Sequence, residues 1–189
     1  MKELLKEDLI NYFRSGEKKP VHFKIGTEHE KFIFNLYTKK PVEYSQKGIL
    51  GIFEILKRNS WIEIKEGESL IGLKKNDLSI TLEPGLQIEL SGAPKNNIHE
   101  TCKEVNLYLK ELKDACNQLD LGIIGIGFIP NATFDEINHL PKKRYSIMRN
   151  YMPKVGTLGL DMMHRTAATQ VNFDFSSEED FKKKTKVAS

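Results

Sequence analysis

The sequence has few of the residues that build disulfide-stapled or membrane-spanning proteins. It contains only two cysteines in 189 residues, which excludes a disulfide framework and predicts a reducing compartment. No apolar run approaches the roughly 20 residues that a membrane-spanning helix requires. The N-terminal stretch MKELLKEDLINYF mixes acids with bases and lacks the apolar segment of a targeting peptide. We therefore expect a cytoplasmic protein with no membrane partner.

The chain also has little excess of either charge, because its formal net charge is only +3. The lysine run at 182–186 supplies much of this excess. No aromatic residues are interleaved with these lysines for stacking on bases, so a solvated helix end is favoured over a nucleic-acid surface. With 39% hydrophobic residues, the chain is long enough to bury one core without disulfides. We expect one domain and no nucleic-acid partner.

The sequence lacks the glycine-rich Walker A motif of P-loop enzymes. Its closest pattern is GIGF at 125–128, inside the apolar stretch LGIIGIGFIP. We interpret that stretch as a buried strand. Any bound phosphate would then be held by metal ions and arginines instead of a P-loop.

The chain does contain short strands interspersed with helices. Turn signals at Glu66-Gly67, Asn76-Asp77 and Pro84-Gly85 separate four strands and predict an antiparallel meander. Without strict βαβ alternation, the pattern indicates an α+β fold with an antiparallel sheet. We expect strands near 22–34, 61–66, 69–75, 78–83, 86–91, 121–130 and 166–177, and helices near 3–16, 48–59, 96–120, 141–152 and 177–189.

The helix at 96–120 has the clearest periodicity of the expected helices. Its apolar positions recur at spacings of three and four, which predicts one buried stripe and a polar back. The stripe comprises Ile98, Cys102, Val105, Leu109, Leu112, Cys116 and Leu119. Both cysteines lie on this helix, fourteen positions apart, and an intact helix keeps them too far apart to form a disulfide.

Three of the expected strands have one face lined by oxygen-bearing side chains. Side chains alternate along a strand, so Glu28 and Glu30 share a face. The same parity groups Gln87, Glu89 and Ser91 on the strand near 86–91, and Gln170, Asn172 and Asp174 on the strand near 166–177.

A wet face is common in antiparallel sheets and would explain these residues without a site. However, the face carries carboxylates and amides with almost no bases, and close carboxylates repel by on the order of 2 kcal/mol. A divalent cation would remove that repulsion. Oxygen-only ligands suit Mg²⁺ or Mn²⁺ more than Zn²⁺. If the strands are neighbours, the pattern favours a metal site.

Four longer motifs resemble the plant and proteobacterial type of glutamate–cysteine ligase. They are IGTEHEKF, SITLEPGLQIELSGAP, RYSIMRNYMPKVGTLGLDMMHRT and TQVNFDFSSEED, and the resemblance runs from about residue 20 to the end. It implies a glutamine-synthetase-like curved antiparallel sheet, a cradle backed by helices. It also implies an ATP- and Mg²⁺-dependent ligation of the glutamate γ-carboxylate to the cysteine amine through an acyl phosphate, the first step of glutathione synthesis.

The resemblance also implies roles for residues at matching positions. Glu28, Glu30, Glu83 and Glu89 match the family's metal-binding acids. Gln170 and Asn172 match polar positions near the metals or phosphates, and no catalytic residue is assigned. Guanidinium groups bind carboxylates and phosphates bidentately, which makes three arginines candidates for substrate or nucleotide binding, each with ordinary surface roles as the alternative. These are Arg144, Arg149 and Arg165.

The sequence departs from the family pattern in two ways. Family members are much longer, so 1–189 is expected to be the N-terminal part of a single catalytic domain, an incomplete cradle that is inactive alone. Many plant members read RTCTVQVN where this chain has RTAATQVN, which places Ala167 where those have cysteine. Cys102 matches a cysteine of plant proteins, some of which use a thiol–disulfide switch; we interpret it as a buried thiol.

Two alternative functions remain open from the residues. One is another carboxylate–amine ligase of the same fold that uses a different amine. The other is a non-catalytic, metal-binding sheet domain that serves as an interaction module.

Overall fold

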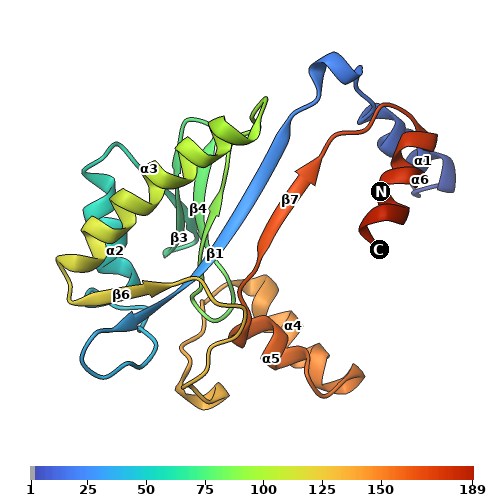
Figure 1. Cartoon of the computed structure of the whole chain (residues 1–189). Helices are drawn as coiled ribbons and strands as arrows, with labels where there is room; N and C mark the ends of the chain where they lie inside the picture. Colours follow the sequence, from blue (N-terminus) through green and yellow to red (C-terminus); the bar gives the residue numbers. More distant parts are fainter. Residues whose placement is uncertain (1–2) are drawn as a thin grey trace.

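A computed structural model describes residues 3–189 of the chain. Its centre is a curved antiparallel sheet that is not closed, with helices packed behind it (Figure 1), as expected for an incomplete α+β cradle. The strands are β1 (Ile25–Asn35), β2 (Ile62–Glu66), β3 (Ser69–Lys75), β4 (Leu78–Leu82), β5 (Ile88–Ser91), β6 (Leu121–Ile124) and β7 (Thr169–Phe173). The helices are α1 (Lys6–Ser15), α2 (Ile49–Lys57), α3 (Ile98–Asn117), α4 (Lys143–Val155), α5 (Gly159–Arg165) and α6 (Glu178–Ala188), with 3₁₀ turns at Pro20–His22 and Phe134–Glu136.

The long strand β1 organises the sheet. The strand order is β2-β3-β4-β5-β1-β6, and β7 also pairs with β1. Strand β5 lies along one edge of β1. The other edge is divided, because β7 pairs with Ile25–His29 and β6 pairs with Phe32–Asn35. The predicted meander of β2 to β5 is confirmed, with antiparallel pairing throughout.

The main core lies between the sheet and helices α2 and α3, which cover one face (Figure 1). Helix α2 contributes Ile49, Ile52, Phe53 and Leu56, all with no exposed surface. The strands contribute alternate residues, as a half-buried sheet requires. They are Leu73, Ile80, Leu82, Ile88 and Leu90.

Helix α3 is rotated relative to the predicted stripe. Ile98 is 61% exposed, and Cys102 is also exposed, so the expectation of a buried Cys102 thiol is wrong. The side chain of Glu104 is buried instead, because it pairs with Lys95 and accepts a hydrogen bond from the amide of Ala93. The buried positions are Thr101, Glu104, Tyr108, Leu112, Ala115 and Cys116. Both cysteines are free, as predicted.

The stretch 121–130 is not the continuous buried strand that was predicted. Strand β6 ends at Ile124, and Gly125–Phe128 form an exposed loop. The reason lies at the edge of β1, where the amide of Glu30 donates to the carbonyl of Ala168. The chain leading into β7 therefore takes the place that a longer β6 would occupy.

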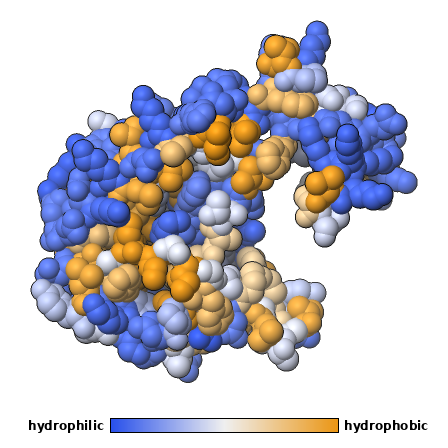
Figure 2. All heavy atoms as spheres, in the orientation of Figure 1, coloured by the Kyte–Doolittle hydropathy of each residue, from blue (hydrophilic) through white to orange (hydrophobic). Residues whose placement is uncertain are grey.

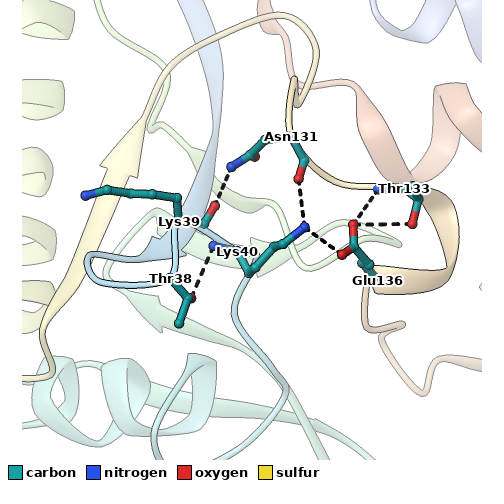
Figure 3. Close-up of polar contacts among 6 residues, drawn as sticks. All are labelled: Thr38, Lys39, Lys40, Asn131, Thr133 and Glu136. Carbon is teal, nitrogen blue, oxygen red and sulfur yellow. Dashed lines mark hydrogen bonds and ion pairs between the residues drawn. The ribbon is translucent and has the colours of Figure 1, made fainter.

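The loop that follows β6 is tied to the turn that follows β1 (Figure 3). The ammonium of Lys40 pairs with Glu136 at 2.6 Å and donates to the carbonyl of Asn131 at 3.4 Å. The Asn131 amide donates to the carbonyl of Lys39 at 2.6 Å. Glu136 also accepts from the amide of Thr133. These contacts anchor the far end of the loop against the sheet.

Helices α1 and α6 lie together at the other end of the β1–β7 ribbon (Figure 1). The Asp174 carboxylate joins them to the ribbon, accepting from the Lys24 amide and pairing with Lys18. Ser177 caps α6, because its side chain accepts a hydrogen bond from the Asp180 amide. Figure 2 shows the molecule hollowed on one side, between the α1/α6 end and the α4/α5 end.

The outer part of the ribbon is poorly covered, because Val171 and Phe173 of β7 are 44% and 67% exposed. The lysine run is a helix end, as expected, because Lys182 and Lys184 pair with acids one turn earlier in α6. No helix of residues 3–189 has the length and apolar character to cross a membrane.

Candidate functional site: a cluster of three carboxylates

Three glutamates, from β1, from β5 and from the turn after β4, converge on the face of the sheet opposite the helical core. The strand register places Glu30 of β1 directly across from Glu89 of β5. Glu83 reaches them because β4 ends at Leu82 and the chain turns there, with the Glu83 amide donating to the Gln87 carbonyl. Carboxylate oxygens of Glu30, Glu83 and Glu89 all lie within 4.8 Å of one another. The predicted shared acidic face is confirmed.

Glu28 lies on the same face but has different partners. Its Oε1 accepts hydrogen bonds from the side-chain amides of Gln170 at 3.0 Å and Asn172 at 2.9 Å. The four acids predicted as metal ligands therefore divide into a cluster of three and one acid held by two amides. The predicted residues Gln170 and Asn172 reach the site through Glu28, because β7 pairs with β1 at these positions.

Burial and the neighbouring carboxylates raise the pKa values of Glu83 and Glu30. Burial, with Glu89 and Glu30 as further causes, raises the pKa of Glu83 to about 7. Burial also raises the pKa of Glu30, and the neighbouring charges of Glu89 and Glu28 add to the effect. No lysine or arginine of the described chain forms an ion pair with these three acids. The site therefore favours the binding of positive charge, either protons or a cation.

This arrangement predicts opposite effects of pH and Mg²⁺ on stability. The folded pKa of Glu83 is raised, so its contribution is greatest below its unfolded pKa of about 4.5 and is lost as pH rises towards 7. Without metal, this group should make the protein less stable at pH 8 than at pH 5. Mg²⁺ should restore stability at pH 8 and release protons when it binds near pH 7.

Thermal unfolding at pH 5 and pH 8, with and without Mg²⁺, tests this prediction. A difference of one pH unit between the folded and unfolded pKa of a group corresponds to about 1.4 kcal/mol of unfolding free energy. Glu66→Gln is the control, since Glu66 is exposed at the end of β2. A stabilisation by Mg²⁺ that is equal at both pH values would contradict the assignment.

Several residues that the sequence analysis did not assign to a site form hydrogen bonds around the cluster. The Tyr145 hydroxyl donates to the Leu82 carbonyl at 3.2 Å and lies 3.5 Å from Glu83 Oε1. Ser91 donates to Glu89 at 2.9 Å, and the Ala168 amide donates to Glu30 at 2.8 Å. Strand parity placed Ser91 on the correct face, whereas no local pattern marks Tyr145.

The three candidate arginines lie on α4 and α5 and contact other groups. Arg165 forms an ion pair with Asp161 at 2.9 Å, and its guanidinium lies over the ring of Phe128. Arg149 lies over the ring of Phe134. Arg144 is at the start of α4. Their roles in binding substrate or nucleotide stay predictions.

The chain matches the family described as glutamate-cysteine ligase family 2 over residues 24–189. It is 51% identical over 181 residues to the chloroplastic glutamate–cysteine ligase of Arabidopsis thaliana. It is 50% identical to the corresponding proteins of Brassica juncea and Nicotiana tabacum. Each comparison covers 96% of this chain but only 34% or 35% of the relative. The chain thus spans about a third of the length of these relatives.

The comparison corrects one expectation and confirms another. These relatives are named as chloroplastic proteins, which contradicts the cytoplasmic location expected from the sequence. The family resemblance is confirmed, because the match spans most of the chain and includes the three clustered acids. The chain belongs to glutamate-cysteine ligase family 2.

Proposed function

We propose that this chain supplies the metal-binding part of an ATP-dependent glutamate–cysteine ligase. Three carboxylates within 4.8 Å of one another, without a paired base in the described chain, support this proposal most directly. The family match and the names of the relatives support the choice of substrates, glutamate and cysteine. The chain covers only part of those relatives, so the rest of the site would lie on further residues.

The acids fit Mg²⁺, with Mn²⁺ as an alternative, by their chemistry. All three ligands are hard oxygen donors, and no histidine or cysteine belongs to the cluster within residues 3–189. Burial and mutual repulsion raise the pKa values of Glu83 and Glu30, and a divalent cation would relieve both. When bound, the metal would neutralise phosphate oxygens during phosphoryl transfer.

The reaction we propose has two steps. The glutamate γ-carboxylate first attacks the terminal phosphorus of ATP, which forms an acyl phosphate and releases ADP. The cysteine amine then attacks the acyl carbon, the amide bond forms, and phosphate leaves with the electrons of the broken carbon–oxygen bond. The amine also loses a proton.

The residues of this chain would position the reactants. Glu30, Glu83 and Glu89 hold the cation, and Tyr145 and Ser91 fix the orientation of two of them through hydrogen bonds. Gln170 and Asn172 hold Glu28 beside this cluster. Such preorganised groups lower the barrier because they need little rearrangement as charge develops.

Product analysis with a matched set of amines tests the function. We expect a protein that contains residues 1–189 and extends to the length of the relatives to form γ-glutamylcysteine from glutamate, cysteine and MgATP. ADP release should depend on glutamate and increase with cysteine. If ADP release does not change with cysteine but increases with another amine, the chain belongs to a different carboxylate–amine ligase. Metal binding without any nucleotide turnover would instead favour an interaction module.

A further inference from the structure

The divided edge of β1 leaves a small opening in the sheet beside the three acids. Strand β7 pairs as far as His29, and β6 begins at Phe32. Glu30 and Lys31 lie between these two pairings. Around them is a cavity of about 190 Å³ lined by Glu30, Lys31, Gly125, Ile126, Gly127, Ala167, Ala168 and Thr169. We call this cavity the edge slot.

The opening brings Lys31 close to Glu30, although the two side chains belong to opposite faces of the sheet. Strand parity directs Glu30 and Lys31 to opposite faces of β1, yet both line the edge slot. The Lys31 side chain lies along Gly125, where an added Cβ would be 3.1 Å from the lysine Cε and 3.4 Å from its Nζ. Glycine at 125 therefore leaves the space that the lysine side chain needs.

Lys31 has a charge without an acidic partner. Its ammonium donates to the carbonyl of Glu30 at 3.0 Å. In the described part of the chain, no carboxylate lies within ion-pair distance of it. The Lys31 side chain is half-buried, so its charge has neither full solvation nor a counter-ion. A bound anion would supply the counter-ion.

The remaining walls of the edge slot are held in place and consist mainly of small residues. The Ala167 amide donates to the Gly127 carbonyl at 3.2 Å, and the Ile129 amide donates to the Arg165 carbonyl at 2.9 Å. Within residues 3–189, the amides of Ile126 and Gly127 donate no hydrogen bond to the protein. These two amides remain available as donors, and both residues line the edge slot with Lys31.

We propose that the edge slot binds an oxyanion, either a carboxylate or a phosphoryl group, through the Lys31 ammonium and the free amides of the 125–127 loop. The proposal rests on the proposed function only in assigning that oxyanion to a ligase substrate. The Glu30 carboxylate also lines the slot and would repel such a group, and the Lys31 ammonium opposes that repulsion. Lys31 is the one basic residue that lines the slot.

Competitive lysine acetylation of the 189-residue chain tests the binding without requiring turnover. The probes are inorganic phosphate and glutarate, a dicarboxylate without an amine. Peptide mass spectrometry would follow acetylation of Lys31 and of Lys110, an exposed lysine on α3 that serves as the internal control. At anion concentrations several times above Kd, we expect either anion to slow the acetylation of Lys31 about fivefold or more. The acetylation rate of Lys110 should not change.

The two probes distinguish the possible sources of the oxyanion. Protection by phosphate alone identifies a phosphoryl subsite, and protection by glutarate alone identifies a carboxylate subsite. Protection by neither anion, or a Lys31 that does not react at all, would overturn the proposal. These results do not depend on ligase activity, so failure of the proposed function would be seen separately.

Variants of Lys31 in the longer protein link the slot to turnover. Lys31→Met keeps the length of the stem and removes the charge, whereas Lys31→Arg keeps the charge. We expect Lys31→Met to raise the KM of glutamate or ATP about tenfold or more, with a smaller effect of Lys31→Arg and none of Lys110→Met. Equal effects of the Met and Arg variants would assign Lys31 a purely structural role.

Discussion

Replacing Glu89 with glutamine is expected to lower kcat by about 100-fold or more in a ligase that contains this chain. Glu89 is the most buried of the three clustered acids, and it lies across from Glu30 in the strand register. Glutamine has nearly the same shape but no charge, so the cluster would lose affinity for Mg²⁺. Raising the Mg²⁺ concentration should restore part of the activity, which a loss of folding would not allow.

The same substitution should raise the stability of the metal-free protein. The negative charge of Glu89 contributes to the raised pKa values of both Glu83 and Glu30, and glutamine removes that repulsion. The glutamine amide can also donate a hydrogen bond to Glu83. Denaturant unfolding without Mg²⁺ measures this effect, with Glu66→Gln as the control. A destabilised variant with an unchanged Mg²⁺ requirement would show that Glu89 is a structural residue.

Replacing Gln87 with methionine is expected to lower the free energy of unfolding by about 3 kcal/mol or more. Gln87 is 1% exposed, and its side chain satisfies three backbone groups. It accepts from the Gly85 amide at 2.9 Å and donates to the carbonyls of Met163 and Thr166. Methionine fills the same volume but leaves these buried groups without partners.

The Gln87 substitution should also weaken the metal site. The Gln87 side chain joins the turn that follows Glu83 to helix α5, and this turn packs so closely that a Cβ on Gly85 would lie 2.3 Å from the His164 carbonyl. Loosening the contact would let Glu83 move away from Glu30 and Glu89. Chemical denaturation and Mg²⁺ titration should therefore change together. Gln46→Met, at an exposed position, is the control and should change neither.

The sequence by itself determined the meander and the identity of its acidic face. Turn residues separate β2 to β5, and side-chain alternation within each strand is a local property of an extended backbone. Glu30 and Glu89 could therefore each be assigned to the polar face of its own strand before the two strands were known to pair. The long motifs that include Glu28, Glu83 and Gln170 likewise identified the family, because they are contiguous in the chain.

The exposure of helix α3 could not be read from its apolar pattern. Cys102 belongs to a regular stripe, yet it is exposed, while Glu104 is buried. The burial of Glu104 depends on Lys95 and the Ala93 amide, which lie outside the helix. A charged residue becomes tolerable in a core only when such partners are supplied, and helix periodicity contains no information about them.

The tertiary structure alone decided how the edge of β1 is shared. Pairing of β7 with Ile25–His29 places two amides on Glu28, so its carboxylate has different partners from those of the three-acid cluster. The same division of the edge ends β6 at Ile124 and opens the slot beside Lys31. These outcomes depend on hydrogen bonds between residues more than a hundred positions apart, such as that between Glu30 and Ala168. Local periodicity sets which face a side chain takes, but only the pairing of distant strands sets which side chains become neighbours.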